Sequence, residues 1–136
     1  MNPQTPTGEY LLLIRGTHWS HGMSPAELQK VMVDFYSWVD DLSQRGVHRG
    51  AQPLMEEGKI VTGGKNGAVT DGVFAESKEA IGGYFLLAVA NIEEAVALAQ
   101  ACPIVACGAQ IEVRPVADVC PVMPRMDSEL NLTAAL

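Results

Sequence analysis

The chain has 136 residues, of which 48% are hydrophobic and 18% are charged, and its formal net charge at pH 7 is −7. This length predicts one globular domain, large enough to form a core without disulfides or a structural metal. The acidic balance, with no basic run to offset it, argues against a nucleic-acid backbone or an anionic membrane surface as partner.

The polar segment 1–8 is expected to be a flexible tail. It has neither the basic nor the apolar part of a secretion signal, and no apolar run in the chain approaches the ~20 residues of a membrane span. We therefore expect a cytoplasmic protein with no membrane partner.

Glu9–Arg15 predicts the first strand. Leu11 and Leu13 would face one side of the sheet, and Leu12 and Ile14 would face the other. Both faces of this strand are therefore apolar, and both need cover.

Two histidines, His18 and His21, follow in a loop over Gly16–Met23. Their spacing allows a metal site, but two imidazoles are too few and no matched third ligand is evident. We predict no metal here and favour a histidine at a pocket edge or on the surface.

The segment Ser24–Glu27 predicts a helix start, with a capping serine, a proline in the first turn and a glutamate that completes a capping box. Apolar side chains then recur every three or four residues, and Gly46 is placed to end the helix. This stripe predicts a core face. Met32, Phe35 and Trp38 within it could also line a pocket where helix and sheet diverge.

Val47–Leu54 is a weaker strand, which Pro53 should end or place at a sheet edge. Ile60–Thr62 and Ala68–Thr70 flank a glycine-rich turn and predict a small inserted hairpin. The glycines do not fit a phosphate-binding loop, because no helix follows them directly.

Tyr84–Ala90 predicts a buried strand that is again apolar on both faces, and Asn91 begins a helix that Pro103 stops. After a loop over Ile104–Gly108, the alternation in Gln110–Val116 predicts a half-exposed edge strand. The helix residues expected to be buried are Ile92, Ala95, Val96, Ala99 and Cys102.

The remaining segment, residues 117–136, is an extension that is either disordered or packed against a neighbouring subunit. The three cysteines, Cys102, Cys107 and Cys120, have no framework spacing, so we expect reduced thiols. Cys102 is interpreted as a core residue, and a reactive thiol or metal ligand is the alternative.

The most distinctive stretch runs from Asp71 to Leu87: an Asp-Gly turn, a charged loop and the apolar strand. Asp71-Gly72-Val73-Phe74-Ala-Glu-Ser-Lys-Glu, with the later pair Gly82-Gly83, closely resembles the signature of the YCII-related proteins. The branch it resembles is named for its Asp-Gly-Pro-Phe motif, and Val73 stands where that motif has proline. The similarity extends from about residue 9 to about residue 116. The loop is either a site mounted on the strand or a solvated connection.

The predicted order is β-α-β-hairpin-β-α-β, which makes a ferredoxin-like α+β sandwich with an inserted β-hairpin over residues 9–116. Two helices cover one face of the sheet, and an open apolar second face would exceed the few hundred Å² that monomers tolerate. We therefore expect a two-fold homodimer with the sheets face to face. The resemblance implies the same arrangement, a dimeric α+β barrel. The alternative cover is the hairpin and residues 117–136 of the same chain.

Asp71 and His48 are the candidate catalytic residues. A histidine oriented by a carboxylate is a usable general acid and base near neutral pH, and neighbouring strands could bring these two together. The structural alternative is that Asp71 caps its loop while Gly72 supplies a positive φ. The residues predicted to line a binding pocket are Arg15, Arg49, Phe74, Glu76, Lys78, Phe35 and Trp38.

The resemblance also implies, for some members, a histidine–aspartate pair with the histidine on the first helix. This helix contains no histidine, so that pair is not carried over. Two functions follow. The first is a cofactor-free enzyme that performs acid/base chemistry on a small aromatic or lactone-like molecule. The alternative is a non-catalytic small-molecule-binding or regulatory module, and the genes of this branch often lie beside alternative sigma factors.

Overall fold

The computed structural model describes residues 8–64, 67–71, 80–118 and 122. The charged loop with Phe74, Glu76 and Lys78 lies outside the described residues, as does nearly all of the C-terminal extension after residue 118. Within the described part, no helix is both long enough and apolar enough to cross a bilayer.

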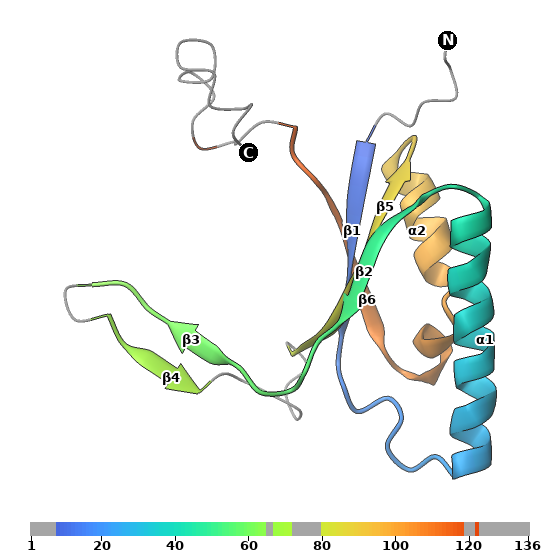
Figure 1. Ribbon diagram of the computed structural model, residues 1–136, viewed down its shortest axis with the longest axis horizontal. Coiled ribbons are helices and arrows are strands. Elements are labelled where there is room, and N and C mark those ends of the chain that lie inside the picture. The colour runs from blue at the N-terminus through green and yellow to red at the C-terminus, as the bar shows by residue number, and fades with distance from the viewer. Residues whose placement is uncertain (1–7, 65–66, 72–79, 119–121, 123–136) are drawn as a thin grey trace.

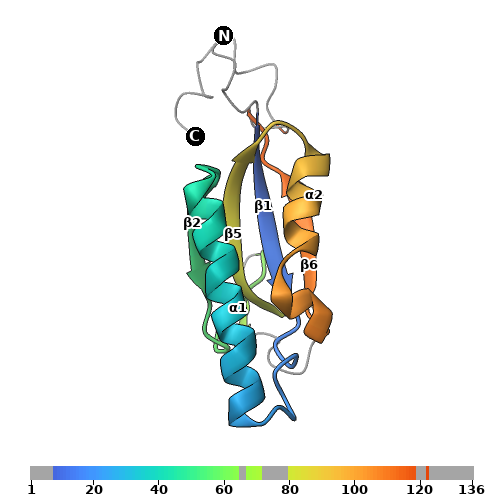
Figure 2. The ribbon, with the colours of Figure 1, turned by 90° about the vertical axis from the view of Figure 1, so that its right-hand side faces the viewer.

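The fold is α+β and ferredoxin-like, as predicted. Its four-stranded antiparallel sheet has the order β2-β5-β1-β6, and both helices cover one face (Figures 1 and 2). The elements are β1 (Gly8–Arg15), α1 (Pro25–Gln44), β2 (His48–Pro53), β5 (Ile81–Val89), α2 (Ile92–Gln100) and β6 (Gln110–Pro115).

The inserted hairpin is present as a separate two-stranded sheet of β3 (Lys59–Val61) and β4 (Val69–Asp71). It projects from the side of the sheet opposite the helices (Figure 1). In that view the hairpin extends away from the sheet, so it does not lie along the helix-free face of its own chain.

The alternation predicted for the first strand is confirmed. Leu12 is fully buried and belongs to the core with Phe85, which pairs with it, and with Leu42 of α1. Leu11 and Leu13 alternate with these core residues and so lie on the helix-free face, where both are half-buried.

Both ends of α1 are capped as the sequence predicted. The Ser24 hydroxyl accepts from the amide of Glu27, and the Glu27 carboxylate accepts from the amide of Ser24. The bond from the Ser24 amide, followed by a smaller effect of the Ser24 side chain on the same carboxylate, lowers the pKa of Glu27. At the other end Gly46 has φ 77°, and the amide of Val47 donates to Leu42, so a left-handed glycine closes the helix.

Three local predictions were wrong. Pro103–Cys107 is a 3-10 helix instead of a loop, because its buried Ile104 packs into the core and Gly108, at φ 108°, closes the turn. The strand expected from Tyr84 begins at Ile81, since Gly82 and Gly83 join the sheet. Two residues expected to be buried on the second helix are exposed, Ile92 by 36% and Val96 by 37%.

Candidate functional site

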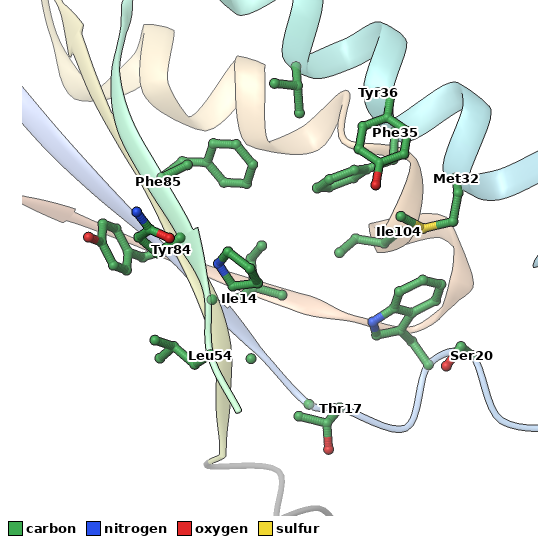
Figure 3. Close-up of a pocket in the computed structure, with 18 of the residues that line it drawn as sticks. Ile14, Thr17, Ser20, Met32, Phe35, Tyr36, Leu54, Tyr84, Phe85 and Ile104 are labelled. Atoms are coloured by element: carbon green, nitrogen blue, oxygen red, sulfur yellow. The ribbon is translucent and has the colours of Figure 1, made fainter. Parts of the chain in front are cut away.

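A pocket of about 450 Å³ lies between α1, the loop after β1 and the adjoining ends of β2 and β5 (Figure 3). Its volume is within the ~300–1,000 Å³ typical of small-molecule sites. Figure 3 shows Met32 and Phe35 of α1 on one side of the space and Phe85 of β5 on the other. The pocket therefore lies between the helix and the sheet, and it includes Met32 and Phe35 of the helix stripe.

The helix wall follows from the spacing of its residues. Met32, Phe35, Tyr36 and Val39 are three or four positions apart and line the same pocket. The ring of Phe35 lies 6.0 Å from that of Phe85 at an interplanar angle of 65°, an edge-to-face contact. The two rings in contact therefore form an aromatic part of the pocket wall.

The sheet wall depends on two glycines. A Cβ added to Gly83 would lie 2.9 Å from the carbonyl oxygen of Gln52 and 3.3 Å from the Cα of Pro53, so only glycine allows β2 this close. A Cβ added to Gly82 would meet the methyl group of Thr17 at an ordinary 3.5 Å. Both glycines line the pocket and add no side chain of their own to this wall.

Polar groups are few and lie mainly near the solvent. Gln52 and Glu56 line the pocket and are exposed, and Tyr36 is 64% exposed. Among the described lining residues, Glu56 is the one charged side chain. The pocket can therefore hold an apolar ring in its interior and hydrogen-bond a neutral polar group at its mouth.

A family model described as the YCII-related domain matches residues 9–119. The chain belongs to the YCII-related family. No curated protein matches the sequence.

In this YCII-related chain, the two candidate catalytic residues lie in different sheets. Asp71 ends β4, where its carboxylate forms an ion pair with Lys59 and its side chain is 80% exposed. His48 begins β2, where its ring packs edge-to-face on Phe85 with the centroids 5.8 Å apart. Neither residue is among those that line the pocket, and a single chain does not bring them together.

The other predicted pocket residues lie in different parts of the fold. Phe35 lines the pocket, whereas Trp38 is buried behind it and donates its indole N–H to the carbonyl of Leu98. Arg15 forms an ion pair with Glu112 at 3.0 Å, beside a second hollow along β6. The side chain of Arg49 donates to the carbonyl oxygen of Gly46.

The histidine loop and the cysteines are also placed. The rings of His18 and His21 stack with their centroids 4.1 Å apart, and the described residues contain no group of three metal-binding side chains. Cys102 is buried, as predicted for a core residue, and burial raises the pKa of its thiol to about 11.

Several pocket residues were not predicted from the sequence. Trp19 and Ser20 come from the loop that holds His18 and His21. Leu54 and Glu56 come from the segment before the hairpin. In the sequence, the pair Gly82-Gly83 stands out only as part of the family signature. Its position directly before an apolar strand is the one signal that could have indicated an open wall.

Proposed function

We propose that this protein binds a small, uncharged molecule with an aromatic ring and acts as a binding module. The observation that carries this proposal is the pocket itself, which has aromatic walls and no described basic residue among its lining. An aromatic ring gains contact area there, and each edge-to-face contact adds about 0.5–1.5 kcal/mol beyond burial. A carboxylate ligand would find Glu56 at the mouth and no described cation to pair with it.

A suitable probe is 2-naphthol, a neutral fused ring with one hydroxyl group. With about eleven non-hydrogen atoms at about 0.5 kcal/mol each, its binding free energy would be about −5.5 kcal/mol, or a Kd of about 0.1 mM. The charged analogue 2-naphthoate should bind roughly tenfold more weakly or worse. Quenching of Trp19 fluorescence, in a Trp38→Phe background, reports binding at the pocket wall.

A matched pair of variants tests the location. Met32→Trp places a large ring inside the pocket, whereas Val33→Trp makes a similar change at the next residue of α1, which is 57% exposed. Because both variants add a tryptophan, their affinity is measured by isothermal titration calorimetry. We expect Met32→Trp to weaken 2-naphthol binding at least tenfold and Val33→Trp to leave it unchanged. Equal affinity in both variants, or no binding to the parent protein, would refute the proposed site.

The second candidate function is cofactor-free acid/base catalysis, and the observation in its favour is the carboxylate of Glu56 at the pocket. The predicted catalytic roles of Asp71 and His48 also remain proposals. A panel of aromatic and lactone substrates would be assayed with the parent protein and with Glu56→Gln, Asp71→Asn and His48→Ala. Turnover that none of these changes affects would remove the proposed roles, and ligand binding without turnover favours the binding or regulatory module.

We also propose a homodimer in which the helix-free faces of two sheets pack together as an α+β barrel. Leu11 of β1 pairs with Leu86 of β5, and Leu13 pairs with Tyr84, so these half-buried side chains form one apolar strip. No described element of the same chain covers that face (Figures 1 and 2). Light scattering on the purified protein should give twice the chain mass.

A further inference from the structure

We infer that the β3–β4 hairpin, described over residues 59–64 and 67–71 and here called the arm, docks against a second copy of this chain, an inference that rests on the homodimer proposed above. The arm's two strands contact each other extensively, and no other described element contacts either strand to a comparable extent. An isolated two-stranded hairpin is marginally stable in water. The arm therefore needs a partner surface that its own chain does not supply.

The described side chains of the arm favour an apolar contact. Val61 pairs directly with Val69, so the two side chains share one face of the hairpin, and they are 72% and 62% exposed. Ile60, on the opposite face, is 41% exposed. The ion pair of Lys59 with Asp71 lies on the Val61–Val69 face at the base of the arm, where it helps to hold the two strands together.

The position of the arm indicates which partner it meets. It projects from the same side as the helix-free sheet face, away from both helices (Figure 1). If two copies place these faces together around a two-fold axis, each arm extends toward the other copy, and the contact is made twice. This geometry favours a second copy over an unrelated protein.

The area that a stable dimer needs supports the same partner. A standard interface buries about 800 Å² on each side. Four strands about 4.8 Å apart, each with about six paired residues at ~3.3 Å, give a face of roughly 400 Å². This flat footprint does not count the relief of the side chains, and the arm adds the exposed side chains of Val61 and Val69 beside the face.

Sedimentation velocity on the full chain tests the inference with a double variant, Val61→Asp with Val69→Asp. Because these side chains are exposed in the single chain, the variant should keep its far-UV circular dichroism. We expect its dimer dissociation constant to rise at least tenfold. The control is Val33→Asp, which makes the same change at an exposed position on α1, and it should leave the dimer intact. A monomeric parent protein, an arm variant that dimerises normally, or equal weakening by the control would each overturn the inference.

A second measurement does not depend on weakening the dimer. A photoreactive benzoylphenylalanine is introduced at position 61, and ¹⁴N-labelled and ¹⁵N-labelled chains are mixed, unfolded together and refolded before illumination. We expect mixed-isotope cross-links, which join residue 61 to the other copy. Cross-links confined to one chain, or none in a dimeric sample, would show that the arm does not contact the second copy.

Discussion

The indole N–H of Trp38 donates to the carbonyl oxygen of Leu98 at 3.0 Å and so links the middle of α1 to the last turn of α2. The backbone amides that end α2 bond to the carbonyls on either side of Leu98. The Leu98 carbonyl is one of the four at a helix end that have no partner within the helix. The Trp38 side chain thus packs in the core and also supplies a hydrogen-bond donor to the C-terminal end of α2.

We predict that Trp38→Phe lowers the free energy of unfolding by about 1–3 kcal/mol, because it leaves the Leu98 carbonyl without its donor in a partly buried position. Urea unfolding measures the loss. Trp19→Phe is the control, since Trp19 lines the pocket and no indole bond from it to a helix end is described. If both variants lose the same stability, the link between the helices does not have this role.

The two pocket glycines should respond differently to the same substitution. In Gly83→Ala the new methyl group would lie 2.9 Å from a backbone oxygen of β2, so the strands must shift, at a cost of about 1–3 kcal/mol. In Gly82→Ala the nearest atom is a side-chain methyl at 3.5 Å, so stability should change by less than about 1 kcal/mol. Thermal unfolding compares them, and equal costs would contradict the close approach of β2 and β5.

The sequence predicted the fold well because its signals were local and agreed with one another. The Ser24–Glu27 capping box, Gly46 and the Asn91 cap marked the helix ends, and short continuous apolar runs marked the two central strands of the sheet. The 3-10 helix was missed because a short Pro-initiated apolar segment has no distinct period.

The candidate site was harder to predict, because a pocket is a space between elements and no single segment contains it. Phe35, a predicted pocket residue, is among the residues that line the cavity, because one apolar helix face both packs on the core and faces the space beside it. Asp71 and His48 could form a pair only if neighbouring strands brought them together. The strand order β2-β5-β1-β6 separates His48 from the hairpin, which forms its own sheet.

The thiol of Cys102 should be inert in the native protein. Burial raises its pKa to about 11, so the thiol stays protonated at pH 8, and the side chain is only 2% exposed. In the variant Cys107→Ser with Cys120→Ser, we expect negligible reaction with a disulfide reagent until denaturant is added. Rapid labelling of the native variant at pH 8 would show that Cys102 is accessible.

The raised pKa of Cys102 also predicts whether the free energy of unfolding rises or falls with pH in the alkaline range. In the unfolded chain the thiol loses its proton near pH 8.5, whereas in the folded chain it keeps it until about pH 11. The unfolded state therefore binds fewer protons between these values, and stability falls as the pH rises through this range. Cys102→Ala should reduce the slope of unfolding free energy against pH, measured by urea unfolding at alkaline pH. An unchanged slope would mean that other groups cause the pH dependence.

Asp71→Asn should have little effect on stability or on 2-naphthol binding. The Asp71–Lys59 ion pair is largely exposed, and exposed pairs contribute at most about 1 kcal/mol. Urea unfolding and the fluorescence titration measure both quantities. A loss of ligand affinity comparable with that of Met32→Trp would mean that Asp71 acts at the pocket in the assembled protein.

The most direct test of the pocket is a methyl NMR titration of the protein with ¹³C-labelled methionine. Met32 lines the pocket, whereas Met55 is 79% exposed and is not among the residues that line it. We predict that 2-naphthol shifts the Met32 methyl signal by the ring current of the bound probe and leaves the Met55 signal in place. An unmoved Met32 signal at saturating probe, or equal shifts at both methyl groups, would contradict the proposed binding site.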